Sequence, residues 1–355
     1  MLIVIKKGIL KCSTKYKRET LMEYFIRSKS LILWVIVCSL LFVSCESNVE
    51  EKVQGIKLDE GAIIQNDSGE LSNFNILDGS YSKVESDKVV GIYNSKCECY
   101  ISSKDGEYIY YNNGVEKKIN SVDVDATNLK MSNEGSYLSY FTKEDGMFAL
   151  KLKSLKDNSD VEFDSNVYIS STYMDWIDDE NIVYYGISNE RINGIFIYNL
   201  KSKKESLFYK LDNGIIQYLK TVDSGLICIQ ETIDNGRMLK LIGKDGQDVD
   251  ILSKEVMQIK DIIQVNEDYY FMGKVIGGIE SVYKLSNKKV KRIVFDFPAV
   301  IDFNKGLSKD KEDNILFVGQ SSKNSALQEI YKVSSKGTIS KVKDSKKEYS
   351  FVRYQ

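Results

Sequence analysis

The sequence predicts an all-β protein folded as a β-propeller, with seven blades favoured over six. Three observations carry this prediction. A unit of short strands and polar turns recurs along the chain. The chain contains 23 Tyr and 14 Phe residues but only one Pro, a composition typical of proteins rich in β-strands. After Cys45, no stretch shows the spacing of an amphipathic helix of about ten residues or more.

The repeat is clearest where a polar turn leads into an aliphatic or aromatic strand. Aligning Tyr137, Ile182, Leu226, Tyr269 and Ile315, which lie in these strands, gives steps of 45, 44, 43 and 46 residues. Another short strand follows each of them, and polar or Gly-containing turns separate the strands. Four short antiparallel strands in about 44 residues is the pattern of one propeller blade.

The number of blades depends on the two ends of this region. The first step, from Tyr108 to Tyr137, is only 29 residues, which predicts a compressed blade around residues 97–120. Residues 61–84 supply three strands without an inner one, and residues 349–354 supply one strand without a blade. Joining them closes a seventh blade and protects the sheet edges. A pair of β-sandwiches or an unclosed array is the remaining alternative.

The turns also carry a family resemblance. Residues 103–106 (Ser-Lys-Asp-Gly) and 132–135 (Ser-Asn-Glu-Gly) resemble the WD40-like, TolB-type propeller repeat, in which Ser-x-Asp-Gly leads into an aromatic-rich strand. The Pro usual in that turn is missing, and later repeats keep only acidic or Asn residues. The resemblance covers most of residues 56–355, the predicted propeller domain. It implies a scaffold and no particular chemistry.

The front of the chain has the pattern of a secretory signal peptide. Leu31 to Val43 is an apolar run of 13 residues, preceded by Arg27 and Lys29. A bilayer-spanning helix needs about 20 apolar residues, whereas the apolar part of a signal peptide has about 7–15. The sequence therefore favours a cleaved signal peptide over residues 22–44. An uncleaved amino-terminal anchor helix is the alternative.

The residues after the apolar run resemble the lipobox of bacterial lipoproteins. There a small residue, here Ser44, precedes a Cys, here Cys45, which receives a diacylglyceryl group before cleavage. Phe42 departs from the aliphatic residue usual at its position. The resemblance implies that Cys45 is lipidated, that it anchors the protein to the membrane, and that residues 45–55 form a solvated tether.

Residues 1–21 fit neither a signal peptide nor a domain. A start at Met22 gives a signal peptide of normal proportions, so we expect residues 1–21 to reflect an upstream mis-start. Residues 1–44 hold eight basic and two acidic side chains. The processed chain would then have 41 basic and 49 acidic side chains, a net charge of −8. This charge argues against a nucleic-acid partner.

The absence of histidine restricts the chemistry. With no His in the chain, the Ser-His-Asp triad, Cys–His pairs, His zinc sites and histidine general bases are excluded. No metal site and no cofactor is predicted. Cys97 and Cys99 are expected to be two buried thiols, with a disulfide as the alternative, and Cys228 is expected in a core strand.

One acidic and aromatic cluster is a candidate ligand surface. Asp175 and Asp178 flank Trp176 near a turn that we expect at one end of the channel. The alternatives are turn hydrogen bonding by the acids and packing of the indole between blades. The acids of residues 310–314 are interpreted as turn formers. Those of residues 122–125 (Val-Asp-Val-Asp) are interpreted as the solvated face of a strand, with a cation site as the alternative.

The sequence favours a non-enzymatic, lipid-anchored protein on the extracytoplasmic face of a bacterial cell membrane, whose propeller binds a protein or envelope component. Its richness in Ile, Lys and Asn suggests an AT-rich genome and, with the lipobox, a Gram-positive envelope. The alternatives are a carboxylate-dependent glycan hydrolase or lyase on a propeller scaffold, and a small-ligand sensor.

Overall fold

The computed structural model describes residues 53–77, 79–122, 125–325, 327–344 and 347–355. Residues 52–355 form one compact unit. The expected signal peptide, the lipidation site Cys45 and most of the expected tether lie outside the described residues. So do Asp123 and Val124 of the Val-Asp-Val-Asp pattern.

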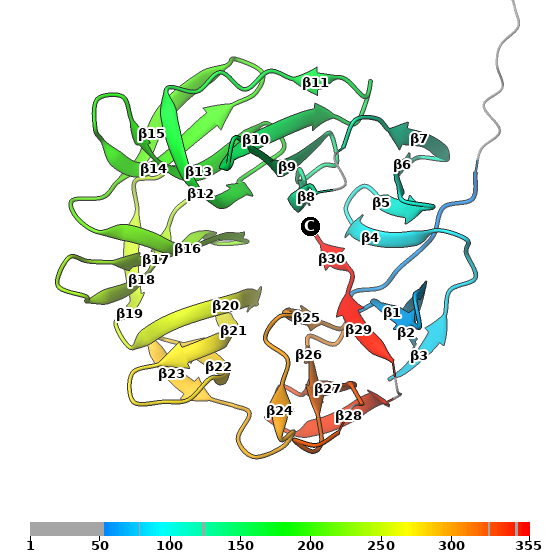
Figure 1. Cartoon of the computed structure of the whole chain (residues 1–355). Helices are drawn as coiled ribbons and strands as arrows, with labels where there is room; N and C mark the ends of the chain where they lie inside the picture. Colours follow the sequence, from blue (N-terminus) through cyan, green and yellow to red (C-terminus); the bar gives the residue numbers. More distant parts are fainter. Residues whose placement is uncertain (1–52, 78, 123–124, 326, 345–346) are drawn as a thin grey trace, which may run out of the picture. The chain divides into compact units, whose positions relative to one another are not determined.

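Within the described residues, thirty strands form seven sheets around a central axis, and each sheet is one blade (Figure 1). Blades are numbered in ring order. From the axis outward, blade 1 holds β29 (Glu348–Phe351), β1 (Ile63–Asp67), β2 (Glu70–Leu77) and β3 (Ser80–Lys83); blade 2 holds β30 (Arg353–Tyr354), β4 (Val89–Asn94), β5 (Cys99–Lys104), β6 (Glu107–Asn112) and β7 (Val115–Ile119); blade 3 holds β8 (Thr127–Met131), β9 (Tyr137–Glu144), β10 (Met147–Ser154) and β11 (Asp160–Val161).

The other four blades continue the same order. Blade 4 holds β12 (Val167–Trp176), β13 (Asn181–Ser188), β14 (Asn193–Asn199) and β15 (Lys204–Lys210); blade 5 holds β16 (Ile215–Val222), β17 (Gly225–Glu231), β18 (Arg237–Ile242) and β19 (Val249–Ser253); blade 6 holds β20 (Val256–Val265), β21 (Asp268–Val275), β22 (Ser281–Ser286) and β23 (Lys289–Arg292). In blade 7, β24 (Val300–Ile301) and β25 (Leu307–Lys309) both pair with β26 (Ile315–Gln320), followed by β27 (Glu329–Val333) and β28 (Ile339–Asp344).

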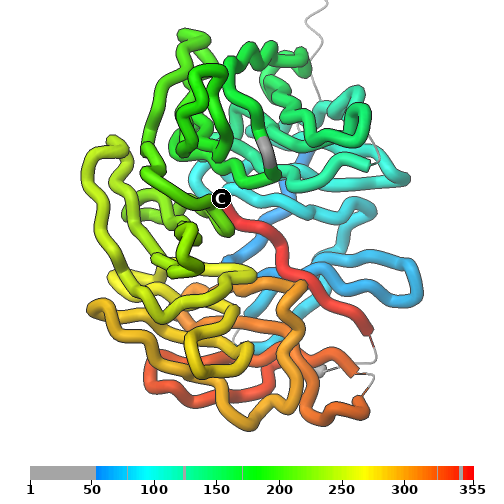
Figure 2. Tube along the Cα trace, turned by 60° about the vertical axis from the view of Figure 1, so that its left-hand side comes forward, coloured from blue at the N-terminus to red at the C-terminus, as the bar shows by residue number. Residues whose placement is uncertain are grey.

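The two ends of the domain close the ring, as the sequence predicts. β29 pairs antiparallel with β1, with Phe351 opposite Ile63, and becomes the inner strand of blade 1. The carboxy-terminal segment is not one strand, however. After Val352 it moves to the next blade, where β30 pairs parallel with β4 and the chain reaches the axis (Figures 1 and 2). Seven blades, closed by both ends, are confirmed.

The compressed blade around residues 97–120 has a simple origin. Residues 103–106, which resemble the propeller turn, connect β5 to β6 in blade 2, whereas the similar residues 132–135 connect the inner strand β8 to β9 in blade 3. The 29-residue step therefore compares turns that are not equivalent. The equivalent strands begin at Cys99 and Tyr137, 38 residues apart.

The core lies between neighbouring blades. One cluster joins Phe141 and Leu152 of blade 3 to Trp176 and Tyr184 of blade 4, and comparable clusters fill the other interfaces. Tyr and Phe at alternating strand positions supply much of this packing, as expected from the sequence. Each blade is thus held mainly by its two neighbours.

The ring has two distinguishable faces. Apart from β30, which is parallel to β4, neighbouring strands within a blade are antiparallel, and all inner strands run the same way. The turns that follow the inner strands therefore lie on one face, here called the turn face. Hairpins between second and third strands, and the beginnings of inner strands, lie on the opposite loop face. The Asn94 side chain donates to the Asn133 carbonyl between turns of blades 2 and 3. The Ile276 N–H donates to the Glu255 carbonyl between loops of blades 5 and 6.

Candidate functional site

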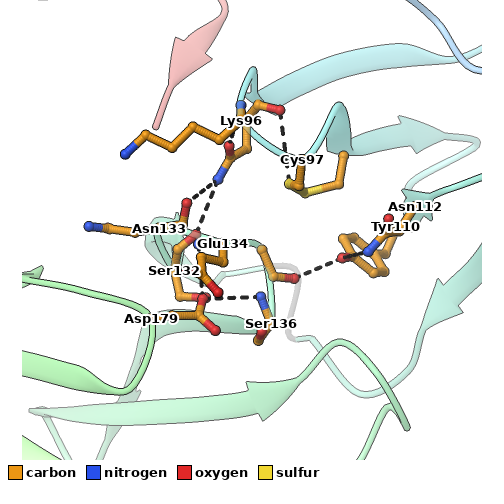
Figure 3. Close-up of a disulfide and its surroundings, with 12 residues drawn as sticks. Lys96, Cys97, Tyr110, Asn112, Ser132, Asn133, Glu134, Ser136 and Asp179 are labelled. Carbon is orange, nitrogen blue, oxygen red and sulfur yellow. Dashed lines mark hydrogen bonds between the residues drawn. A yellow bond between two sulfur atoms is a disulfide. The ribbon is translucent and has the colours of Figure 1, made fainter.

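The turn face contains a disulfide between Cys97 and Cys99 (Figure 3). The expectation of two buried thiols is therefore wrong. It assumed a continuous strand, but residues 95–98 form a turn in which Glu98 has φ of 49°, and only Cys99 belongs to β5. Gly135 of blade 3 packs against the bridge, where an added Cβ would lie 2.3 Å from the Cys99 sulfur.

Cys228 is a free, buried cysteine in β17, which confirms the predicted core strand. Burial raises the pKa of its thiol to about 12, against a smaller lowering by the Lys240 ammonium. Because the thiolate is the reactive form, the Cys228 side chain is a core residue and not a candidate nucleophile.

Asp178 and its neighbour Asp179 shape the turns of blades 3 and 4. The Asp178 carboxylate accepts hydrogen bonds from the backbone and side-chain N–H groups of Asn181, both at 2.8 Å. Asp179 reaches the neighbouring turn of blade 3, accepting from the N–H groups of Glu134 at 2.9 Å and Ser136 at 3.4 Å (Figure 3). The Asp178 contacts are the local turn chemistry typical of Asp, whereas the Asp179 contacts connect two blades, and Asp178 stays exposed at the turn face.

Trp176 lies inside an interface and not at the mouth of the channel. Its side chain is 2% exposed and stacks on Tyr137 of blade 3 at 6.0 Å between ring centroids. The indole N–H donates to the Ser139 hydroxyl at 2.9 Å, so its polar atom is satisfied within the core. This placement differs from the ligand-surface role expected of Trp176, because Trp176 ends β12 on the side that faces blade 3.

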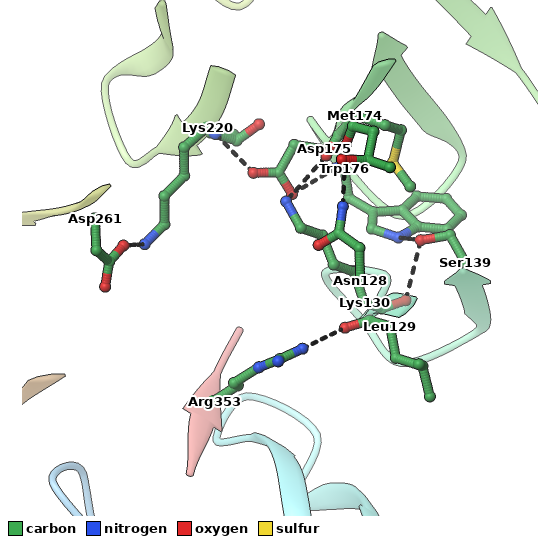
Figure 4. Close-up of polar contacts among 12 residues, drawn as sticks. Asn128, Leu129, Lys130, Ser139, Met174, Asp175, Trp176, Lys220, Asp261 and Arg353 are labelled. Atoms are coloured by element: carbon green, nitrogen blue, oxygen red, sulfur yellow. Dashed lines mark hydrogen bonds and ion pairs between the residues drawn. The ribbon is translucent and has the colours of Figure 1, made fainter. Parts of the chain in front are cut away.

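Asp175, the third residue of the sequence-derived cluster, lies on the inner strand β12. Its carboxylate accepts from the Lys130 ammonium of blade 3 at 2.9 Å and from the Thr221 N–H of blade 5 at 2.8 Å (Figure 4). One side chain therefore connects three consecutive blades. The side chains of Lys130 and Asp175 are 19% and 12% exposed, so the pair is largely removed from solvent.

The same arrangement recurs two blades further round the ring. Asp261 of blade 6 accepts from the Lys220 ammonium of blade 5 at 2.7 Å and from the Leu307 N–H of blade 7 at 2.8 Å. Lys220 precedes Thr221, so the two arrangements are joined through β16 (Figure 4). We call Lys130, Asp175, Lys220 and Asp261 the inner ladder.

The inner ladder is arranged to hold blades together. Both carboxylates are occupied by a lysine and by a backbone N–H of the following blade. Burial and, to a smaller extent, the carboxylates of Asp261 and Asp175 raise the pKa of the nearby Tyr218 well above its usual range, so its phenol stays protonated. Sequence reasoning singled out Asp175 but did not anticipate its lysine partner.

The loop face carries most of the exposed large apolar side chains of the described residues. They project from hairpins, from the beginnings of inner strands, and from the connection between blades 6 and 7; they are Leu71, Met147, Phe148, Tyr168, Ile187, Ile215, Ile233, Ile276, Ile279, Phe295 and Phe297. Turns of the turn face, such as those at Glu134 and Asp178, present exposed polar side chains.

A cavity of about 380 Å³ opens between blades 6 and 7 beside these side chains. Its lining includes Lys260 of β20, Glu280 of the blade 6 hairpin, and Asp302, Phe303 and Gln328 of blade 7. The cavity lining therefore combines the aromatic side chain of Phe303 with charged and amide groups, a composition typical of binding sites. Over the described residues, no group of three His, Cys, Asp or Glu is placed to hold a metal ion, and no helix is long and apolar enough to cross a membrane.

Sequence reasoning missed this part of the loop face. Residues 272–280 (Met-Gly-Lys-Val-Ile-Gly-Gly-Ile-Glu) are interpreted from the sequence as a hairpin loop. The structure confirms a hairpin, but residues 272–275 belong to β21 and only residues 276–280 form the loop, with Gly277 at φ of 69°. The available signal was the presence of Ile276 and Ile279 within a glycine-containing turn, where polar residues are usual.

No protein-family model matches the sequence, and no curated protein matches it. Solved structures are similar in fold. An acylaminoacyl peptidase from Pyrococcus horikoshii has a TM-score of 0.53 and 13% identity, covering 82% of this chain and 51% of that chain. A prolyl endopeptidase has a TM-score of 0.50 and 12% identity, covering 81% and 42%. TolB from Acinetobacter baumannii has a TM-score of 0.46 and 9% identity, covering 82% and 67%. The chain thus spans about half or less of these two peptidases, and the similarity to them concerns the propeller fold alone.

Proposed function

We propose that this protein is a lipid-anchored binding module on the extracytoplasmic face of a bacterial membrane, whose propeller holds a protein or envelope component on its loop face. The observation that carries the proposal is the concentration of exposed apolar side chains on that face, beside a cavity. The lipobox-like Ser44-Cys45 pair supports anchoring.

The alternative functions gain less support. A carboxylate-dependent glycan hydrolase or lyase needs two acids free to act on a bound sugar. Asp175 and Asp261, the acids of the inner ladder, are each engaged by a lysine and a backbone N–H. The two acids such an enzyme would have to use are therefore those of the cavity, Glu280 and Asp302, and Asp302 already accepts from Asn304 and Gln328. A small-ligand sensor could use the cavity, but it would not account for the exposed apolar side chains elsewhere on the loop face.

The anchoring part is tested by replacing Cys45. We expect Cys45→Ser to abolish the mass increase of the diacylglyceryl group and to release the protein from the membrane fraction. Cys38→Ser is the matched control, because Cys38 lies in the same leader but follows Val37 and not a small residue. We expect this change to leave the mass increase and the membrane retention unaltered. Full membrane retention of Cys45→Ser without lipid would instead support the uncleaved anchor helix.

The binding part is tested by crosslinking on intact cells followed by mass spectrometry of captured proteins and glycans. The paired change Ile276→Ser and Ile279→Ser should reduce capture of the principal partner at least tenfold, because buried apolar anchors dominate interfaces. Leu77→Ser is the matched control: Leu77 is 45% exposed but lies at a turn-face hairpin of blade 1. Equal capture by all three proteins would contradict a binding role of the loop face.

A further inference from the structure

The blade 6 hairpin and the following connection present four exposed apolar side chains. Ile276, Ile279, Phe295 and Phe297 are 63%, 56%, 56% and 46% exposed, and together we call them the blade 6 patch. They lie on two neighbouring loops at the side of the cavity between blades 6 and 7. Leaving four large apolar groups in water is unfavourable, so the patch is suited to be covered.

Hydrogen bonds fix the loops that carry the patch. The Tyr283 hydroxyl donates to the Ile279 carbonyl at 2.5 Å, and the Arg292 guanidinium donates to the Phe295 carbonyl at 2.6 Å. The same guanidinium lies over the Phe295 ring at 5.2 Å from its centroid. The patch is therefore held in place before any partner arrives, which lowers the entropic cost of binding.

The lining of the cavity next to the patch holds more acidic than basic side chains. Asp302 accepts hydrogen bonds from the Asn304 N–H at 3.1 Å and the Gln328 side-chain amide at 3.3 Å, both of them neutral donors. The Glu280 side chain has no ion pair or hydrogen bond within the described part of the chain, and the same is true of the Lys260 side chain. Two carboxylates thus share the cavity with one ammonium group, an arrangement that attracts a further cation.

We propose that the loop face binds a protein segment that is both apolar and basic. Its Lys or Arg side chain enters the cavity between Glu280 and Asp302, and its neighbouring apolar side chains cover the blade 6 patch. This inference rests on the proposed binding function and names the chemistry of its partner. Charge complementarity carries it: the cavity lining holds the carboxylates of Glu280 and Asp302 against the one ammonium group of Lys260, and the processed chain would have an excess of acidic groups.

A lipid surface fits these features less well. Anionic headgroups would be repelled by the carboxylates that line the cavity, and an acyl chain offers no cation to pair with them. Val53, the first described residue, lies at the other face, because its N–H donates to the Gly114 carbonyl in a turn-face hairpin of blade 2.

The experiment uses the purified full-length chain in detergent and three fluorescent peptides of twelve residues. The first alternates Leu or Phe with Arg, the second replaces Arg by Glu, and the third keeps Arg but replaces Leu and Phe by Ser. We expect the first to bind at least tenfold more tightly than either of the others in fluorescence anisotropy. Because this comparison uses the unaltered protein, it does not depend on the folding of a variant.

Two sets of variants then locate the binding. Glu280→Gln combined with Asp302→Asn should reduce the preference for the Arg peptide over the Glu peptide at least fivefold. Ile279→Ser combined with Phe297→Ser should weaken the binding of the first peptide at least tenfold. The turn-face variants Leu77→Ser and Glu134→Gln are controls expected to change nothing, and melting temperatures verify that each variant is folded.

Several outcomes would overturn the inference. Equal binding of the Glu peptide would remove the basic requirement, and equal binding of the Ser peptide would remove the apolar one. Binding to phosphatidylglycerol vesicles that is lost in the patch variant would make a membrane the occupant. If no peptide binds while the patch variants still abolish capture on cells, the proposed function stands and the apolar, basic partner class fails.

Discussion

Deletion of residues 349–355 is expected to leave the propeller without a stable folded state. The segment supplies the inner strand of blade 1, and Tyr349, Phe351 and Val352 are 1%, 8% and 2% exposed. Burying each of these side chains contributes about 1.5–3 kcal/mol, so their sum approaches the whole stability of a typical domain. Their removal would also uncover the edges of β1 and β4.

The deletion is measured by circular dichroism during heating and by size-exclusion chromatography. A synthetic peptide of residues 347–355 added to the shortened chain should restore part of the cooperative transition, and a scrambled peptide should not. Removal of Gln355 alone is the matched control and should cost little. An unchanged melting temperature after loss of all seven residues would show that the pairing of β29 with β1 does not hold the ring.

Asp175→Ala is expected to destabilise the domain by about 3 kcal/mol. It leaves the Lys130 ammonium, 19% exposed, without its carboxylate and removes the acceptor of the Thr221 N–H. Breaking one side of a largely buried ion pair typically costs about 3–5 kcal/mol, and an unsatisfied buried N–H adds to the cost. Urea unfolding, followed by tryptophan fluorescence, gives the free energy of unfolding directly.

A double-mutant cycle separates the pair from its surroundings. Lys130→Met added to Asp175→Ala should recover part of the lost stability, because no uncompensated charge then remains. The exposed pair of Lys203 and Glu162, whose side chains are 57% and 73% exposed, provides the comparison. Glu162→Gln should cost far less stability than Asp175→Ala, because solvent screens an exposed ion pair. Equal costs at the two pairs would contradict a special role of the inner ladder.

The sequence was informative about the fold because a propeller is a repeated pattern. Alternating apolar positions in short strands identify blades, and two incomplete groups of strands at the ends identify the closure, so that both were predictable without any tertiary contact. The error in blade 2 came from similar turns at different hairpins. Short polar turns look alike wherever they occur, and only the pairing of β4 with β5 shows which hairpin is the first.

The candidate site was less predictable, for a physical reason. Asp175, Trp176 and Asp178 stand within four residues, yet the alternation of strand and turn sends them to the inner ladder, the core and the turn face. The cavity beside the blade 6 patch joins Lys260 to Gln328, which lie on different blades. Such groupings arise from the packing of blades against each other, and the repeat in the sequence does not predict them.

The order in which the blades are synthesised has a consequence for quality control. β1 is translated early, but its inner neighbour β29 follows only after six further blades have left the ribosome. Throughout that interval β1 presents an unpaired edge, which is a template for aggregation. A chain that stops early keeps this edge permanently. Chaperones and proteases could therefore recognise incomplete chains by the exposed edge of β1. In a complete chain, pairing with β29 covers that edge.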